Sequence, residues 1–410
     1  MKIKVLIVDD SLVVRSMLKR LFEQDERFEL CPSAENGRDA IRKNDLYKPD
    51  FIIMDLNMPI MNGLESSREI LSKSSPGIVA FTTEDYADVC FKSFEIGILS
   101  VIKKPDLAKM KQSMLQDFID KIYFIAQSHI QKNQHEKIDD KSKSLKITKI
   151  SKTGELNELN GENTNLSEKE FFENQQNFQN QNQQKKSKIY KQDFIYLKNR
   201  KSSGKYKILA IGSSTGGPGA LKKVLAGLGK NFPLPVVITQ HNESGFDDYL
   251  VKWLTLTTGM NVKIAQNYEN LKAGTAYLAP SNFHLTLTKK NNSSEDVFIK
   301  LDSGAMVNFM RPAVDKMFES VAQIFGKHAI ALILTGMGKD GAVSCKKLFD
   351  CGAFTIAEAE DDCVVFGMPR AAIEENAISC VARLDAIAGI VKNLCHSEFS
   401  SESVAKELLN

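Results

Sequence analysis

The stretch ILAIGSSTGG, residues 208–217, decides how the second half of this chain folds. Its apolar first half predicts a buried strand, and its glycine- and hydroxyl-rich second half predicts a tight turn into a helix that begins near Pro218. Residues 212–216 read G-x-S-x-G, a turn that can lift a serine hydroxyl out of a sheet. That serine is a candidate nucleophile. The N–H groups at the start of the helix, including that of Thr215, are a candidate oxyanion hole.

A phosphate- or dinucleotide-binding loop is the alternative interpretation, because it uses a similar strand, turn and helix. The lysine of a Walker loop is missing here, and the pattern G-x-G-x-x-G is not met. The stretch alone therefore leaves both interpretations open. The rest of the chain has to distinguish them.

Length and composition restrict the class of protein. A chain of 410 residues is expected to form two or three domains, and a formal net charge of +3 indicates no dominant polyanionic partner. No apolar run reaches about 18 residues, so we expect no membrane insertion. Asp9 and Asp10 come too early for a signal peptide. The seven cysteines are scattered without a C-x-x-C pair, so we expect reduced thiols and a cytoplasmic protein.

Residues 1–128 alternate apolar strands with helical patterns, which predicts a parallel sheet covered on both faces. Polar side chains follow the strands at the edge where such a sheet binds ligands. Three carboxylates in one crevice repel one another, and a cation such as Mg²⁺ makes them tolerable. A lysine and a hydroxyl beside them could contact a phosphoryl group carried on one carboxylate. These residues are Asp9, Asp10, Asp55, Thr82 and Lys104.

The motifs around these residues are V-D-D at 8–10, M-D-L-N-M-P at 54–59, M-N-G at 61–63 and K-K-P at 103–105. In this combination the segment resembles the receiver domain of two-component response regulators. The resemblance implies that Asp55 accepts a phosphoryl group from a histidine kinase. It also implies that Asp9, Asp10 and Asp55 hold Mg²⁺.

The resemblance further assigns a switch hydroxyl and a phosphate-contacting lysine. We expect Thr82 to be the switch hydroxyl rather than Thr83, because Thr82 directly follows the strand. We expect Lys104 to contact the phosphate rather than Lys103, because the family's lysine immediately precedes proline. Val101 stands where the family usually has an aromatic switch residue, so the switch readout is expected to differ.

Residues 129–205 break the pattern. Ten of the eleven residues from 174 to 184 are Asn or Gln, and the surroundings offer no apolar face. Such a segment cannot bury a core and is expected to form a long disordered linker. The basic, aromatic-containing end of this segment, 185–207, is compatible with nucleic-acid binding, but a solvated linker is the interpretation we adopt, with no nucleic-acid partner.

Residues 206–395 alternate again, with apolar strands expected at 235–240, 329–334 and 353–356 and helical stretches between them. The tail is 396–410. The predicted fold class is therefore α/β, with two doubly wound parallel-sheet domains joined by the linker. The first domain is flavodoxin-like and the second is Rossmann-like.

A serine nucleophile needs a histidine base, and the base needs a group that fixes its tautomer. Of the six histidines, His241 directly follows an apolar strand and so shares the sheet edge with the serine. His284 is expected in a turn that could line the substrate cleft. Asp340, in the glycine-rich loop 336–341, is the preferred acid. N–H groups near Met337 could complete the oxyanion hole.

Asp361 and Asp362 follow the next strand and are rival candidates for the acid. The preference for Asp340 rests on the glycines of its loop, which let the backbone approach a reacting centre. Serine, histidine and aspartate then come from three strand ends, in the order Ser, His, Asp. From these residues the expected activity is a serine-dependent acyl hydrolase under phosphorylation control.

The second domain resembles the methylesterase domain of the chemotaxis protein-glutamate methylesterases. The resemblance implies that the serine before Thr-Gly-Gly is the nucleophile, which selects Ser214 over Ser213, and that His241 and Asp340 complete the triad. The stretches that carry it are 211–217, 240–241, 279–280 with 284–285, 311–315, 334–341 and 366–369.

The resemblance also implies the reaction. The family removes methyl groups from glutamate methyl esters on chemoreceptor signalling helices, releasing methanol, and deamidates certain glutamines. No cofactor is implied for the ester chemistry, and Mg²⁺ serves the receiver only. The unphosphorylated receiver is expected to cover the cleft until Asp55 is phosphorylated. Because the linker is long for the family, we expect weaker autoinhibition here.

Two alternative functions make different demands on the sequence. A transcriptional regulator would need a small helical DNA-reading domain after the receiver, and 206–395 does not have that pattern. A serine esterase acting on another protein or on a small-molecule ester under two-component control remains open. Arg311 and His284 are the candidates for lining the cleft that would decide specificity.

Overall fold

The computed structural model describes both expected domains and little of the segment between them. The expected tail 396–410 and Thr83 lie outside the described residues, as does almost all of the expected linker. In the described parts, no helix has the length and apolar character needed to span a bilayer. The described residues are 2–82, 92–93, 95–104, 115–116, 118–131, 133, 196–197, 206–242, 245–290 and 296–395.

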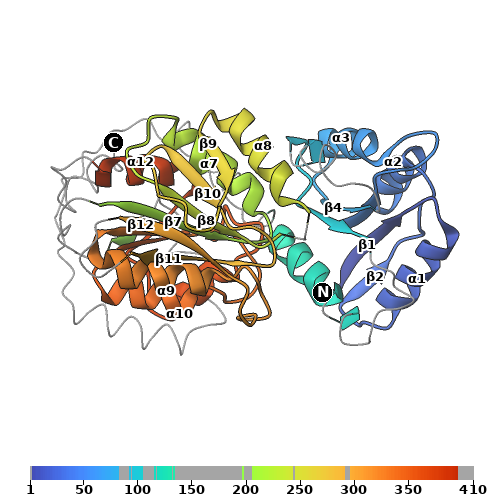
Figure 1. Ribbon diagram of the computed structural model, residues 1–410. Coiled ribbons are helices and arrows are strands. Elements are labelled where there is room, and N and C mark those ends of the chain that lie inside the picture. The colour runs from blue at the N-terminus through green and yellow to red at the C-terminus, as the bar shows by residue number, and fades with distance from the viewer. Residues whose placement is uncertain are drawn as a thin grey trace, which may run out of the picture. The chain divides into compact units, whose positions relative to one another are not determined.

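The N-terminal domain is built on a five-stranded parallel sheet with the strand order β2-β1-β3-β4-β5 (Figure 1). This order is that of flavodoxin-like domains, the fold class predicted for this half of the chain. Strands β3 and β4 are buried at every position, as expected for central strands covered on both faces. The bounds are β1 Ile3–Val8, β2 Phe28–Leu30, β3 Phe51–Asp55, β4 Gly77–Thr82 and β5 Ser100–Lys103.

Helices cover both faces of this sheet. Helix α1 (Leu12–Glu23) and the helical residues 118–131 pack on one face, and helices α2 (Gly37–Tyr47) and α3 (Gly63–Lys73) pack on the other. Each of the three labelled helices begins after a Ser or Asn whose side chain accepts a backbone N–H of the first turn. Such caps satisfy an N–H group that has no partner inside the helix.

The N-terminal domain extends beyond the predicted boundary at residue 128. Helical residues continue to 131. The Nε2 atom of His129 lies 2.9 Å from the carbonyl oxygen of Ser75, and Asn133 donates to the same oxygen over 2.9 Å. The sequence placed these polar residues in the linker because they show no apolar face. Hydrogen bonds to Ser75, which hydrophobic periodicity cannot reveal, attach them to the domain.

The C-terminal domain contains an eight-stranded sheet in the order β6-β15-β14-β13-β7-β8-β10-β9. All its pairings are parallel except that of β6 with β15. Strand β6 lies inside the predicted linker range, so the sheet begins earlier in the chain than expected. The bounds are β6 Tyr196–Leu197, β7 Ile208–Ser213, β8 Val236–Gln240, β9 Asn261–Ile264, β10 Thr275–Leu278, β13 Ala329–Ile333, β14 Phe354–Glu358 and β15 Cys380–Ala382.

Two groups of helices cover the two faces of this sheet (Figure 1). Helices α7 (Gly217–Leu228), α8 (Asp247–Thr258) and α12 (Leu384–Cys395) bury their apolar faces on one side. On the other side lie α9, α10 and α11. The bounds of these are α9 Val314–Phe325, α10 Ala342–Asp350 and α11 Met368–Glu374, with the short 3-10 helix η1 at Gly326–His328.

The region between α8 and α9 differs from the prediction of helical stretches. It contains β9, β10 and an antiparallel hairpin formed by β11 (His284–Lys289) and β12 (Val297–Asp302). The sequence HLTLTK of β11 alternates apolar and polar residues with the period of a half-buried strand, which was the missed signal. His284, expected in a turn, is the first residue of β11.

From the strand order, ligands are expected to bind at the carboxyl end of β7. The chain leaves β7 for β8 on one side and later returns to β13 on the other side. Such a reversal opens a crevice at the carboxyl ends of the strands. Ser214, His241 and the loop that carries Asp340 follow β7, β8 and β13 respectively.

Candidate functional site

Ser214 stands at the corner between β7 and α7. Its N–H donates to the carbonyl oxygen of Thr335 over 3.0 Å, and its own carbonyl accepts from Gly217 over 2.8 Å. Gly216 has φ +83°, in the left-handed region, and a Cβ there would come within 2.5 Å of Val364. The corner therefore needs glycine at 216 both for its backbone conformation and for space.

Gln240 joins the backbones of the candidate nucleophile and base. In the parallel pairing of β7 with β8, Gln240 is the partner of Ser213, so Ser214 and His241 are equivalent positions on neighbouring strands. The Nε2 atom of Gln240 donates to the carbonyl oxygens of Ser214 (2.8 Å) and His241 (3.0 Å). The hydroxyl of Ser213 donates to its Oε1 over 2.7 Å. One buried amide thus holds both corners together.

Gly217 makes room for that amide. A Cβ at residue 217 would lie 1.9 Å from Oε1 of Gln240. No side chain fits there without displacing the Gln240 side chain. Glycine is therefore required at the two positions of the Thr-Gly-Gly motif for different reasons. The backbone is left-handed at 216, and the Gln240 side chain approaches closely at 217.

The structure brings His241 and Asp340 into direct contact. Nε2 of His241 lies 2.8 Å from Oδ2 of Asp340, and both side chains are buried. With Nε2 donating to the carboxylate, the other ring nitrogen, Nδ1, carries a lone pair. Nδ1 is buried and has no hydrogen-bond partner among the described residues. It is therefore the nitrogen left to accept a proton from the serine.

Asp340 is surrounded by donors at the N-terminus of α9. Its carboxylate accepts from the N–H groups of Val314 (2.7 Å) and Asp315 (3.1 Å), and the Nδ2 atom of Asn308 lies 3.3 Å away. Burial alone would raise the pKa of Asp340. The hydrogen bond and charge of His241, together with the two amides, outweigh that effect and lower it. Asp340 is thus held as a carboxylate.

Two glycines let α9 come this close. A Cβ at Gly212, in β7, would lie 2.4 Å from Cγ1 of Val314, and one at Gly341 would lie 2.5 Å from the same atom. Val314 therefore packs directly on the backbone of the nucleophile strand and of the loop that carries the acid. This contact brings the first amides of α9 within reach of Asp340.

Asp315 is a second buried carboxylate beside the triad, and the sequence analysis gave it no role. It accepts from the N–H of Ser344 over 2.8 Å and from Nδ2 of Asn308 over 2.9 Å. Burial and the nearby charge of Asp340 raise its pKa. Asn308 thus donates to both carboxylates. Asn308 has no local sequence signal that would mark it as part of the site, whereas Asp315 lies in the stretch 311–315 that carries the family resemblance.

The two backbone N–H groups that the sequence suggests for an oxyanion hole make no hydrogen bond of their own to a described residue. Within the described parts of the chain, no hydrogen bond uses the N–H of Thr215 or of Met337. Gly336, next to Met337, is so close to the nucleophile that a Cβ on it would lie 2.7 Å from Cβ of Ser214. The loop after β13 therefore runs beside the serine before it reaches Asp340.

His284 differs from its expected place in the wall of a cleft, and Arg311 bonds to the backbone of its own loop. His284 is 0% exposed; its Nε2 lies 2.9 Å from the carbonyl oxygen of Ala305, and its Nδ1 accepts from the N–H of Ala313 over 3.1 Å. Arg311 donates to the carbonyl oxygens of Ser303 and Gly304 over 2.8 and 2.9 Å. Both residues hold the loop 303–313 in place, His284 from the interior and Arg311 from its partly exposed side. Both ring nitrogens of the buried His284 imidazole are occupied by hydrogen bonds to backbone groups, so neither is available to a substrate.

The rival acid Asp362 has another structural role. Its carboxylate accepts from the N–H of Leu384, the first residue of α12, over 2.8 Å and from Arg383 over 3.2 Å. It therefore stabilises the start of α12, where a negative charge is favourable. Asp340 alone of the three candidates contacts His241 in the described structure.

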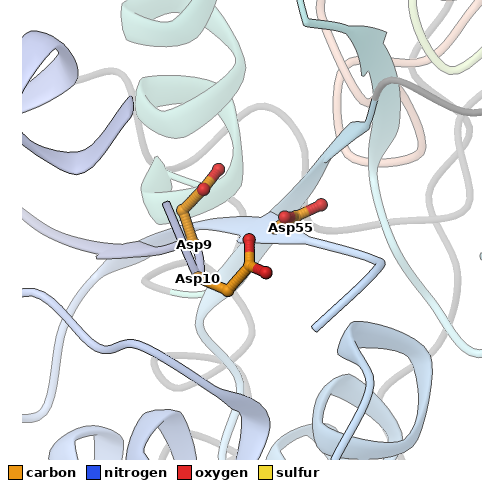
Figure 2. Close-up of side chains that lie close together, drawn as sticks. All are labelled: Asp9, Asp10 and Asp55. Atoms are coloured by element: carbon orange, nitrogen blue, oxygen red, sulfur yellow. The ribbon is translucent and has the colours of Figure 1, made fainter. Parts of the chain in front are cut away.

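In the N-terminal domain, three carboxylates converge at the sheet edge (Figure 2). Carboxylate oxygens of Asp9, Asp10 and Asp55 lie within 4.8 Å of one another. The ammonium group of Lys104 is 2.8 Å from Asp9 and 2.7 Å from Asp55. Thr82, at the end of β4, is buried and accepts the N–H of Lys104 at its carbonyl over 2.8 Å. The residues predicted for this site therefore lie together.

Charge balance at this edge is incomplete. Burial raises the pKa of Asp55 and the nearby Asp9 adds to the effect, while Lys104 opposes it. Burial alone would lower the pKa of Lys104, but its hydrogen bonds to Asp55 and Asp9 outweigh that and raise it. In the part of the chain that the structure describes, the ammonium group of Lys104 is the one that pairs with the cluster of three carboxylates formed by Asp9, Asp10 and Asp55. This oxygen-rich, net negative set fits a hard divalent cation such as Mg²⁺.

Comparison with known proteins agrees with both halves. Residues 5–115 match the response regulator receiver domain family and residues 209–391 match the CheB methylesterase family. The chain is 31% identical to a protein-glutamate methylesterase/protein-glutamine glutaminase of Halalkalibacterium halodurans, covering 96% of this chain and 99% of that protein. A Thermotoga maritima relative of the same description is 32% identical, covering 91% and 93%.

A solved structure is also similar. The CheB methylesterase catalytic domain of Thermotoga maritima is 42% identical, with a TM-score of 0.45, and the match covers 46% of this chain and 98% of that one.

Proposed function

Because the chain belongs to the protein-glutamate methylesterase/protein-glutamine glutaminase family, we propose that it hydrolyses glutamate methyl esters on chemoreceptors under the control of receiver phosphorylation. The observation that carries the proposal is the buried His241–Asp340 pair, 2.8 Å apart, at the strand end next to Ser214. Asp340 orients the imidazole through Nε2, which leaves Nδ1 as the base.

The reaction is an acyl transfer to water in two halves. The Oγ atom of Ser214 attacks the side-chain carbonyl carbon, and its proton moves to Nδ1 of His241. The carbon–oxygen bond to the methoxy group then breaks, and His241 returns the proton to the leaving oxygen, so that methanol is released. A water molecule attacks the resulting glutamyl ester of Ser214, with His241 accepting and then returning its proton. The products are a glutamate carboxyl group and free Ser214.

The N–H groups of Thr215 and Met337 would stabilise the oxyanion that forms in each half. Donors that are already oriented stabilise such charge without reorganisation, which makes them a large contribution to catalysis. Deamidation of a receptor glutamine would follow the same route, with ammonia as the leaving group in place of methanol.

The N-terminal domain supplies control. Asp55 is the proposed phosphorylation site, with a histidine kinase as the phosphodonor, and Thr82 and Lys104 would contact the phosphoryl oxygens. Asp9, Asp10 and Asp55 would hold Mg²⁺. When bound, the cation offsets the negative charge that builds up as the phosphoryl group is transferred. Lys104 already contacts Asp9 and Asp55, so it is placed to bind the oxygens of a phosphoryl group carried on Asp55.

The test uses receptor membranes that carry isotope-labelled methyl esters. We expect the full chain to release labelled methanol, faster after treatment with a small acyl phosphate and Mg²⁺, and Ser214→Ala to release none above background. Release that survives Ser214→Ala would contradict the mechanism. If neither protein releases methanol while the wild type hydrolyses a small ester, the alternative of a different ester substrate is favoured.

A further inference from the structure

The loop after β12 ends in a tight turn that carries a conformationally unfavourable aromatic residue. Val307 and Met310 pair as an antiparallel bridge around Asn308 and Phe309. These two residues have φ +52° and +62°. Two-residue hairpin turns with both φ values positive prefer Asn followed by Gly. Asn308 fits this pattern, but Phe309 occupies the glycine position, where a bulky side chain is an outlier.

Phe309 gains almost nothing from its own chain in return. Its side chain is 94% exposed, and the nearby Met306 is 58% exposed. A single exposed apolar residue needs no explanation. A fully exposed phenyl ring on a strained backbone is different, because glycine at the same position would relieve the strain and remove apolar surface from water. Strain that the fold retains without internal benefit points to a role outside the chain.

The turn is fixed to the triad. Nδ2 of Asn308 reaches both Asp315 and Asp340, at 2.9 and 3.3 Å. The start of the loop is held by Arg311, through the carbonyls of residues 303 and 304, and by His284, through that of Ala305. Phe309 therefore stands one residue away from a side chain that contacts the catalytic acid, on a loop that these hydrogen bonds anchor.

We propose that Phe309, together with Met306, is the contact that docks the receptor helix beside its methylated glutamate. The inference rests on the proposed function. A glutamate side chain that enters the site from a helix brings the next helical turns, spaced by about 5.4 Å, against the surface around the triad. Apolar positions three or four residues from the ester would meet the phenyl ring. Exposed aromatic side chains are the usual anchors of such contacts.

The experiment compares wild type, Phe309→Gly and Phe309→Leu, each treated with an acyl phosphate and Mg²⁺. Initial rates of labelled methanol release are measured over a range of methylated receptor membrane concentrations. We expect Phe309→Gly to raise KM about 10-fold with kcat within about twofold of wild type. Phe309→Leu should recover most of the loss. The thermal midpoint of Phe309→Gly should be equal to or higher than that of wild type, because the strain is removed.

Tyr268 provides a matched control. It is also an aromatic residue with positive φ, +60°, and 68% exposed, but its N–H bonds to the Ile299 carbonyl in β12 and no described hydrogen bond joins it to the triad. Tyr268→Gly should likewise have a thermal midpoint equal to or higher than that of wild type, and it should leave KM unchanged. An equal rise in KM for both variants would indicate a general effect of removing strain and would overturn the proposal.

Two other outcomes would also overturn it. A wild-type KM for Phe309→Gly would show that the ring does not contact the receptor. Faster release by the unphosphorylated variant, with no change after phosphorylation, would assign the ring to the chain's own receiver domain. If wild type releases no methanol at all, the proposed function fails first and this inference fails with it.

Discussion

Asp55 and Asp340 are buried to the same extent, 3% exposed each, near the carboxyl ends of central parallel strands in their two domains. Their pKa values nevertheless shift in opposite directions, upward for Asp55 and downward for Asp340. Burial therefore does not decide the protonation of these groups. The number of donors aimed at each carboxylate does.

The two sites differ in which groups stabilise the negative charge of the carboxylate. Asp340 accepts from His241 and from two amides at the start of α9. These donors belong to the chain and are always present. Asp55 shares one ammonium group with Asp9 and accepts the Asn57 N–H over 3.2 Å. The negative charge of Asp340 is thus stabilised by the folded chain itself. The carboxylates around Asp55 keep negative charge that is available to a cation and to phosphoryl transfer.

The largest expected effect tests whether catalysis requires the charged carboxylate of Asp340. Asp340→Asn keeps the shape of the side chain but removes the charge that fixes the tautomer of His241. We expect kcat for methanol release to fall about 10⁴-fold, as for the same substitution in a serine protease triad. The matched change in the other domain, Asp55→Asn, should leave the rate of the unphosphorylated protein close to wild type. Comparable losses in both variants would contradict the difference between the sites.

A smaller effect tests whether Gln240 positions the backbone at Ser214 and His241. Gln240→Met preserves side-chain length but removes the amide that joins the carbonyls of Ser214 and His241. We expect kcat to fall about 10- to 100-fold, because small misplacements of reacting groups are costly, with little change in KM. Ser213→Ala leaves both Nε2 contacts intact and should cost less. If Ser213→Ala is the more damaging variant, the amide is not the positioning group.

The smallest effect is one of stability, and its sign should differ between the domains. At pH 7 in EDTA, Asp55→Asn should raise the free energy of unfolding by about 1 kcal/mol, because it removes a repelled buried charge. Asp340→Asn should lower it by about 1 to 3 kcal/mol, because buried donors lose their acceptor. Urea titrations followed by circular dichroism measure the first. Fluorescence of Trp253, the single tryptophan, measures the second.

The Asp340 effect should also depend on pH. Because the folded pKa of Asp340 lies below the unfolded value of 3.8, its contribution is present above that value and is lost as the pH falls through the folded pKa. The difference between wild type and Asp340→Asn should therefore shrink in strong acid. A difference that grows on acidification would reverse the assigned direction.

Much of this arrangement could be predicted from the sequence. Apolar runs that end in polar residues locate the strand ends, and so predict Asp55, Lys104, His241 and Asp340 at the two sheet edges. The parallel sheets of the two domains and the contact between His241 and Asp340 agree with that prediction. Strand ends are visible in a sequence because hydrophobicity changes abruptly there.

The remaining features depend on contacts between distant residues. Nothing local to Asn308 or Asp315 indicates that they reach Asp340, and nothing local to Gln240 indicates that it joins two carbonyls. His284 looked like a cleft residue because a histidine near a turn suggests chemistry, whereas its two ring nitrogens satisfy backbone groups inside the fold. The β11–β12 hairpin differs from the prediction for another reason: its strands are short, and only the alternation of apolar and polar residues in β11 distinguishes them from a helical stretch.

The contact of Val314 with Gly212 and Gly341 has a consequence for anyone who would transplant this triad into another scaffold. None of the three residues carries a functional group, yet the hydrogen bonds to Asp340 depend on how closely α9 approaches the sheet. A graft of serine, histidine and aspartate alone would leave the acid to be solvated by water. The smallest transferable unit includes one valine and two positions with no side chain at all.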